Sequence, residues 1–207
     1  MLPGRRPVPD DRTQEILDAA STAFARHGYR AASLRSIASD IGLNHSTLLY
    51  CFGSKETLLE AILNRRDRDA DTAYMTPVTA YDKVANVYRR AVYNEAVPDR
   101  VRLYSALLCE AIDPGHPAHA HFARRYARVL DTLTDELRSL QTQRLIRPDL
   151  DPRAEAAWFT ALWDGLQLHA PYEGELHIPE RLLHAIDGLF ADSVPLERRA
   201  QLLTTVA

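Results

Sequence analysis

The sequence has 207 residues, of which 46% are hydrophobic and 26% are charged, an ordinary composition for a globular protein of one or two domains. Two cysteines provide no disulfide framework, the start lacks the apolar core of a signal peptide, and no apolar run is long enough to cross a membrane. We therefore exclude disulfide-rich and membrane-spanning classes and expect a cytoplasmic protein. The net charge of −3 argues only weakly against nucleic-acid binding, because phosphate contacts depend on local charge.

Residues 1–10 contain three prolines, a glycine and the pair Arg5 and Arg6, which predicts a flexible N-terminal arm. Two interpretations of the arm stay open: a solvated tail, or a basic arm that contacts DNA phosphates or the minor groove. Apolar residues then recur at helical spacing, which predicts a first helix from Asp11 that stops at Gly28.

The segment that starts at Ser33, SLRSIASDIGLNHSTLLYCFGSK, has the parts of a helix-turn-helix. Ser33 is a good N-cap for a short helix, and Gly42 lies where that helix would end in a left-handed residue. Asn44 is expected to cap a second short helix. Leu48 and Phe52, four residues apart, then face back toward the first helix.

The remaining residues of the second short helix point away from this packing: His45, Ser46, Thr47, Leu49 and Tyr50. In a helix-turn-helix, the start of the second helix lies in the DNA major groove and meets base edges. The spacing by itself favours DNA binding no more than ordinary packing, because short helices with a small residue and a glycine occur in many helical proteins.

A fourth helix is expected from a Ser54 cap to about Tyr74, and the alternating charges of residues 65–69 predict a solvated face on it. The break at Thr76 and Pro77 begins a second domain. Its expected helices cover residues 81–97, 99–112, 117–144, 153–169 and 179–192, with a short tail helix over 196–207. Because no alternating strand pattern occurs, the chain is predicted to be all-α.

Residues 156–170 are apolar on more than one side, so this helix is expected to be buried all round, by its own chain or by a second copy. His116, His119 and His121 lack the spacing and the additional ligands of a metal site, and a solvated helix start is favoured. We expect no metal and no cofactor. Without a phosphate loop or a nucleophile elbow, we also expect no catalytic residues and no enzyme.

The block from Ile16 to Leu63 resembles the N-terminal domain of the TetR family of transcriptional regulators. The residues that carry the resemblance, in the family's order and without a gap, are Ile16, Ala19, Ala20, Phe24, His27, Gly28, Tyr29, residues 34–38, residues 41–43, residues 46–48 and residues 52–56. The resemblance implies an N-terminal helix-turn-helix head over 11–75, including a linking helix, and an effector-binding and dimerisation domain over 76–207. It implies a homodimeric repressor that leaves a palindromic DNA operator when a small molecule binds.

The resemblance also assigns residues to sites. The implied DNA contacts are Arg35, Asn44, His45, Ser46, Thr47, Leu49, Tyr50 and Lys55. The family usually has a tyrosine at Leu49 and an aromatic residue or histidine at Cys51. Leucine cannot donate to a phosphate, so Leu49 would contact a thymine methyl group or Tyr50 would take over the role. Thiol regulation at Cys51 is not expected, because no basic cluster accompanies it.

Two further sets follow from the resemblance. The implied ligand pocket is Tyr88, Val92, Tyr104, Leu107, Leu108, Phe122 and Tyr126, for which the alternative is ordinary core. The implied dimer interface is Trp158, Leu162, Trp163, Leu166, Leu182, Ile186, Leu189 and Phe190, for which the alternative is a monomer core. In this scheme the ligand tilts the fourth helix and spreads the two heads. The competing classes are an all-helical ligand-binding protein or enzyme without DNA binding, and an activator with the same head.

Overall fold

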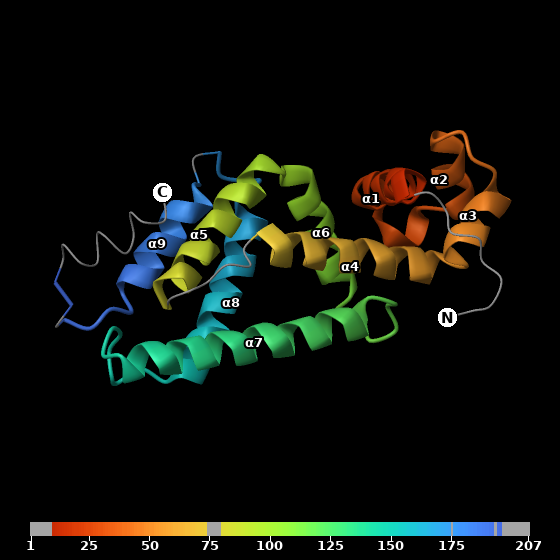
Figure 1. Ribbon diagram of the computed structural model, residues 1–207. Coiled ribbons are helices and arrows are strands. Elements are labelled where there is room, and N and C mark those ends of the chain that lie inside the picture. Colours follow the sequence, from red (N-terminus) through yellow and green to blue (C-terminus); the bar gives the residue numbers. More distant parts are fainter. Residues whose placement is uncertain (1–9, 74–79, 175, 193, 196–207) are drawn as a thin grey trace. The chain divides into compact units, whose positions relative to one another are not determined.

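The computed structural model describes residues 10–73, 80–174, 176–192, 194 and 195. Over these residues the chain forms nine α-helices and one isolated antiparallel bridge between Ile146 and Phe190 (Figure 1). The helices are α1 (Asp10–Ala31), α2 (Leu34–Asp40), α3 (His45–Phe52), α4 (Lys55–Ala73), α5 (Ala80–Ala96), α6 (Pro98–Glu110), α7 (His119–Thr142), α8 (Pro152–His169) and α9 (Ile178–Asp187). The predicted all-α class is confirmed.

Most helix boundaries lie within two residues of those expected, and the exceptions have visible causes. α1 is broken at Gly28 as predicted, but one further turn carries it to Ala31. α9 ends at Asp187, earlier than expected, because the chain after it bonds to the loop before α8. There the Arg147 N–H donates to the Leu189 carbonyl oxygen over 3.0 Å. The predicted arm, the residue Tyr74 and the tail helix lie outside the described residues.

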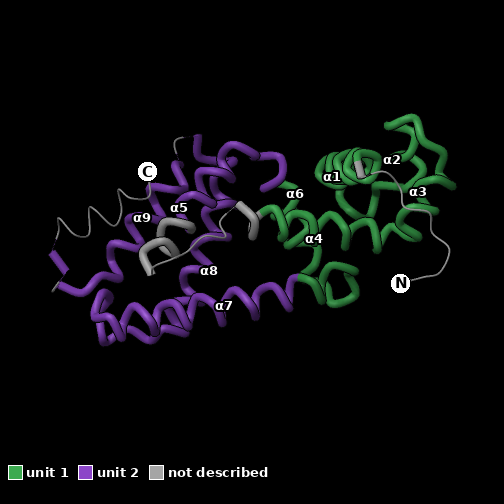
Figure 2. The backbone as a smooth tube through the Cα atoms, viewed as in Figure 1, with its two compact units in different colours: residues 1–69, 102–121 green, residues 70–101, 122–207 purple. Residues whose placement is uncertain are grey.

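The chain divides into two compact units (Figure 2). Unit 1 contains residues 1–69 and 102–121, and unit 2 contains residues 70–101 and 122–207. Residues 102–121, which the sequence assigned to the second domain, thus cluster with the helix-turn-helix. None of the helices in the described ranges is long and apolar enough to span a lipid bilayer.

Each unit has its own hydrophobic core. In unit 1 the largest fully buried side chains come from α1, α2, α3, α4 and α6: Ile16, Phe24, Ile37, Leu48, Leu58, Leu59, Leu63 and Leu107. In unit 2 the core draws on α5, α7, α8 and α9, with Leu182 completely buried. Burial of such side chains contributes roughly 1.5–3 kcal/mol each, so the apolar stripes of the helices are the main source of stability in both units.

The charged run on α4 is not the solvated face that the sequence predicts. The Arg65 guanidinium is largely buried against α1, where it contacts Gln14 at 3.0 Å and Asp18 at 2.8 Å. The Arg66 guanidinium lies 3.4 Å from the ring centroid of Tyr104, an arrangement that favours a cation on an aromatic face. These contacts correct the prediction for the first part of the run, because the charges fix α4 within unit 1.

Candidate nucleic-acid interface

The turn between α2 and α3 is closed by backbone hydrogen bonds. Gly42 has φ 65°, a conformation that favours glycine, and the Leu43 N–H donates to the Ala38 carbonyl oxygen over 2.8 Å. At the start of α2, the Ser33 hydroxyl accepts a hydrogen bond from the Ser36 N–H over 3.1 Å, as predicted for an N-cap. The short helix therefore has defined ends on both sides.

α3 packs against the rest of unit 1 through two buried side chains. Leu48 and Phe52 are buried, as their spacing predicts, and so are Ile37 and Ala38 on α2. Asn44 is the N-cap residue of α3, but its side chain makes no capping hydrogen bond, so the expected bond is absent. The other side chains of α3 are exposed or half-buried at the surface of unit 1.

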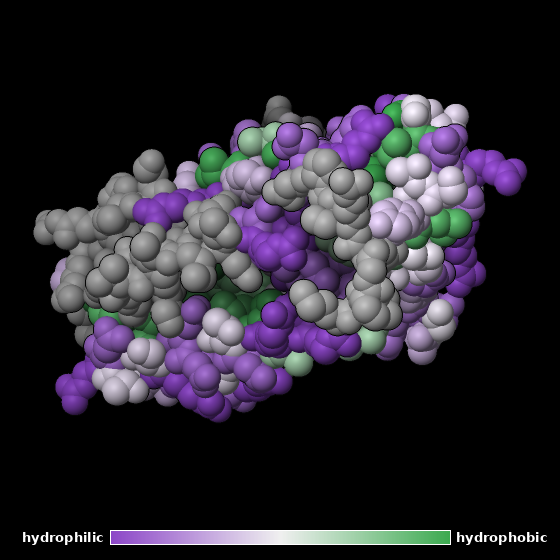
Figure 3. All heavy atoms as spheres, turned by 45° about the vertical axis from the view of Figure 1, so that its right-hand side comes forward, coloured by the Kyte–Doolittle hydropathy of each residue, from purple (hydrophilic) through white to green (hydrophobic). Residues whose placement is uncertain are grey.

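The predicted contact residues are all at least partly accessible. Exposed are Arg35, Asn44, Ser46, Thr47 and Tyr50; half-buried are His45, Leu49 and Lys55. The Tyr50 side chain is the largest of these, with 48% of its surface exposed. Hydrophobic and hydrophilic groups are mixed on the surface where α2 and α3 lie (Figure 3). Such a mixture of hydroxyls, an imidazole, a guanidinium and an aromatic ring suits phosphate oxygens and base edges.

Lys55 is partly engaged within the unit. Its ammonium donates to the Arg30 carbonyl oxygen over 3.2 Å and lies 4.4 Å from the ring centroid of Tyr29. Burial lowers the pKa of Lys55, while the charges of Glu56 and Glu110 act in the opposite direction. An ammonium group has three donors, so the bond to Arg30 does not by itself prevent a phosphate contact.

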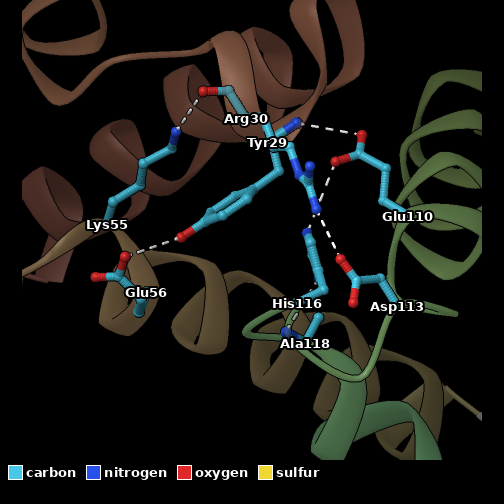
Figure 4. A network of polar contacts seen from close by, with 8 residues as sticks. All are labelled: Tyr29, Arg30, Lys55, Glu56, Glu110, Asp113, His116 and Ala118. Carbon is cyan, nitrogen blue, oxygen red and sulfur yellow. Dashed lines mark hydrogen bonds and ion pairs between the residues drawn. The ribbon is translucent and has the colours of Figure 1, made fainter.

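Tyr29 is a supporting residue that sequence reasoning named only as part of the resemblance. Its hydroxyl donates to Glu56 over 3.3 Å (Figure 4). Its ring meets the Phe24 ring edge-on, with the two ring centroids 5.4 Å apart. Burial, followed by the charge of Glu56, raises the pKa of Tyr29 to about 12. The sequence shows an aromatic residue directly after a helix-ending glycine, which could have drawn attention to Tyr29. It does not show that Tyr29 contacts Glu56 and Phe24.

The three histidines do not form a solvated helix start. His116 and His121 are buried, and α7 begins only at His119. His121 lies 3.4 Å from a carboxylate oxygen of Asp67. Among the described residues no group of three His, Cys, Asp or Glu side chains could hold a metal ion. The solvent-exposed interpretation is thus wrong for two of the three histidines.

The predicted pocket residues divide between the two units. In unit 1, Tyr104 and Leu107 are buried and Leu108 is half-buried. In unit 2, Phe122 is buried, Tyr88 and Tyr126 are half-buried, and Val92 is exposed. The Tyr126 hydroxyl already donates to Asp164. Exposure makes Val92 the least suitable member of the predicted set.

The predicted interface residues separate into two groups. Four of them are at most 9% exposed and belong to the core of unit 2: Leu182, Ile186, Leu189 and Phe190. The sequence predicts that these four residues form a dimer interface. In the structure, the apolar stripe of α9 packs instead against α5 and α8 of the same chain. On α8, by contrast, Trp158 is 50% exposed, and Leu162, Trp163 and Leu166 are half-buried.

Comparison with known protein families places these features in context. The family described as bacterial regulatory proteins, tetR family, matches residues 16–62, which include α2 and α3. The chain is a transcriptional regulator with a helix-turn-helix head, and it belongs to the TetR family. Residues 88–195 match a more particular group, the C-terminal domain of BetI-type transcriptional repressors.

Relatives and solved structures agree with this assignment. The HTH-type transcriptional repressor SCO4008 of Streptomyces coelicolor is 30% identical over 146 residues, which are 69% of this chain and 73% of the relative. The repressor Rv1474c of Mycobacterium tuberculosis is 26% identical over 178 residues, which are 85% and 89% of the two chains.

Two solved structures share the fold at low identity. SmeT of Stenotrophomonas maltophilia, in complex with triclosan, has a TM-score of 0.77 and 20% identity, over 90% of this chain and 95% of SmeT. A regulator from Saccharomonospora viridis, in complex with choline, has a TM-score of 0.69 and 22% identity, over 86% and 94% of the two chains.

Proposed function

We propose that this chain is a cytoplasmic, ligand-released homodimeric repressor that binds a palindromic operator through α3. One observation carries the proposal: Leu48 and Phe52 are buried while Ser46, Thr47 and Tyr50 of the same helix are exposed. A helix held in this way can enter the major groove without losing its own packing. Relatives that match most of the chain are described as repressors, which favours repression over activation.

The contact residues are assigned roles by their chemistry. Ser46 and Thr47, in the first turn of α3, suit base edges or phosphate oxygens, as does the Tyr50 hydroxyl. Arg35 suits a phosphate, and Lys55 would meet one as a point charge. Leu49 would contact a thymine methyl group, because it offers no donor.

A second copy of the chain would pack on α8. Trp158 and Leu168 are exposed there, and a side chain added at Gly165 would meet nothing within 4 Å. Helices approach most closely where a residue has no Cβ, so Gly165 is suited to the point where two α8 helices cross. Twofold pairing would present two α3 helices to successive half-sites of DNA.

We propose the residues of the predicted pocket as candidate effector contacts: Tyr88, Val92, Tyr104, Leu107, Leu108, Phe122 and Tyr126. Their apolar surfaces and few hydroxyls have the character of small-molecule sites. Two structural relatives were solved with small molecules, triclosan and choline, which supports a ligand-binding role for this fold. A ligand would release DNA by binding the non-DNA-binding conformation more tightly, with a coupling of typically 1–3 kcal/mol.

The direct test is selection of bound duplexes from a random pool, followed by affinity measurements with Thr47→Ala. We expect an inverted repeat to be selected, and Thr47→Ala to weaken binding roughly tenfold, since a hydrogen bond to a charged group is worth about 1.5–3 kcal/mol. Thr142→Ala is the matched control, because Thr142 is also an exposed helical threonine but lies in unit 2. Equal affinity of Thr47→Ala and Thr142→Ala for the selected duplex would refute the assignment of α3.

A further inference from the structure

The bend near the end of α1 is covered by a side chain from α6. At Gly28 the backbone has φ 74° and ψ 161°, which interrupts the helix directly before Tyr29. The Tyr29 N–H donates to Oε1 of Glu110 over 3.3 Å, and a Cβ at Gly28 would lie 3.1 Å from the same oxygen. Glu110 therefore replaces the helical acceptor that the bend removes.

The second oxygen of Glu110 faces His116. The His116 ring is 4% exposed and meets the Tyr29 ring edge-on at 5.0 Å. Its Nδ1 accepts a hydrogen bond from the Ala118 N–H over 3.2 Å, so the proton of the neutral ring lies on Nε2 (Figure 4). Nε2 is 3.7 Å from Oε2 of Glu110, and among the described residues neither of these two buried atoms has a hydrogen-bond partner.

We propose that Glu110 is a positioning residue for operator binding, and that His116 makes its hold on the α1 bend sensitive to protonation. This proposal depends on the proposed function, because it assumes that α3 binds DNA. It adds a regulatory role for Glu110 and His116 to the DNA contacts proposed for α3.

The bend and the DNA-binding helices are joined by short connections. The Ala32 N–H donates to the Gly28 carbonyl oxygen over 3.3 Å, and α2 starts at Leu34. On the other side, Tyr29 and Arg30 contact Glu56 and Lys55 at the start of α4. The direction in which the chain leaves the bend therefore determines where α2 begins, and Glu110 fixes that direction.

Protonation of His116 would disturb this arrangement through its other nitrogen. A second proton can bind only at Nδ1, which is the acceptor for the Ala118 N–H. The protonated ring could stay near Glu110 only by opening the turn between α6 and α7. We therefore expect acid to loosen the support of the α1 bend.

The groups around the ring define the pH range. α1 provides Tyr29 and Arg30, α6 provides Glu110, and the turn provides Asp113, whose carboxylate pairs with Arg30 at 2.8 Å. Tyr29 connects the ring to Lys55 and Glu56 of α4, and His119 follows in α7 with Nδ1 2.8 Å from the Ala111 carbonyl oxygen. Burial lowers the pKa of His116, the charge of Glu110 opposes this shift, and Arg30 adds to it. The ring is thus neutral at pH 7 and gains its proton only in more acidic solution.

The first experiment compares three full-length variants on the duplex selected by the parent protein at pH 7.5. We expect Glu110→Ala to weaken binding at least tenfold, because the Tyr29 N–H loses its acceptor. Glu110→Gln retains an amide oxygen for that N–H and should bind within threefold of the parent. Cys109→Ser, an exposed neighbour on α6, should bind like the parent. Binding by Glu110→Ala within twofold of the parent would overturn the proposal.

The second experiment isolates the proton. In His116→Asn, the side-chain oxygen can still accept from the Ala118 N–H, but the group does not titrate. The ratio of parent to variant association constants should fall at least threefold between pH 7.5 and pH 5.5, while pH effects that the two proteins share cancel in the ratio. A constant ratio would overturn the role of His116.

Hydrogen exchange without DNA separates this proposal from the proposed function. The Tyr29 amide should exchange at least tenfold faster in Glu110→Ala than in the parent and Cys109→Ser. If exchange is unchanged, the bend does not depend on Glu110, whatever the protein binds. If exchange accelerates but the parent selects no duplex, the proposed function fails instead, and with it the role of Glu110 in DNA binding. Should Glu110→Ala not fold, the ratio measured with His116→Asn decides.

Discussion

At the scale of single residues, Gly28 shows how one backbone conformation organises the head. Its torsions lie in a region that is essentially restricted to glycine, and Oε1 of Glu110 lies 3.1 Å from the position that a Cβ would take. The glycine was predictable as a helix stop from its position after an amphipathic segment. That Glu110 also restricts this position to glycine was not predictable, because Glu110 is far away in the sequence.

Replacement of this glycine tests the strain directly. We expect Gly28→Ala to lower the free energy of unfolding by roughly 1–3 kcal/mol, because alanine would have to adopt a disfavoured conformation and push against Glu110. Urea unfolding followed by circular dichroism measures the change. Gly174→Ala is the control, since a Cβ there meets nothing within 4 Å and its φ is not in the left-handed region. Equal stability of the two variants would contradict the interpretation of the bend.

Lys55 illustrates the same limit of sequence reasoning. The resemblance implies that it contacts a phosphate, which stays a prediction. Its bond to the Arg30 carbonyl oxygen and its place on the Tyr29 ring depend on a segment 25 residues earlier. The sequence around Lys55 does not show that residues so far away in the chain will contact it.

At the scale of helices, α8 and α9 show what an amphipathic stripe can and cannot predict. Both were expected to be buried, and both contribute to the core of unit 2. An apolar stripe predicts burial but does not identify the helix that packs against it. For α9 the neighbours are α5 and α8 of the same chain, whereas α8 retains an exposed tryptophan.

This distinction predicts different effects for two truncations. Leu182→Ala should lower the free energy of unfolding by about 2–5 kcal/mol without weakening dimerisation, because Leu182 is in the core of the protomer. Trp158→Ala should instead raise the dimer dissociation constant and have little effect on unfolding of the protomer. Sedimentation equilibrium combined with denaturation separates the two effects. If Leu182→Ala weakens dimerisation and Trp158→Ala does not, the dimer interface would be on α9 and not on α8.

At the scale of the whole molecule, the sequence predicted the fold class, the helix-turn-helix and the family. It did not predict which helices cluster together in each unit. The all-α fold, the helix-turn-helix and the family were all accessible from capping residues, helical spacing and resemblance. The inclusion of residues 102–121 in unit 1 was not, because it depends on contacts such as that between Tyr29 and Glu110, 81 residues apart. α4, α6 and α7 each contain residues of both units, so the chain passes between the units within helices.

For the whole molecule we predict a twofold, salt-sensitive complex with DNA. Two heads would bind the two halves of one operator, and their phosphate contacts would release counterions. Each phosphate contact contributes about −0.9 to the slope of the logarithm of affinity against the logarithm of salt concentration, and such complexes typically make about 6–10 contacts. We therefore expect a slope steeper than about −5.

The most direct measurement is fluorescence anisotropy of the selected duplex over a range of salt, compared with the same duplex in which one half-site is scrambled. We expect one protein dimer per intact duplex, a steep salt dependence, and an affinity at least a hundredfold lower for the scrambled duplex. Equal binding to both duplexes, or binding that salt does not weaken, would contradict it.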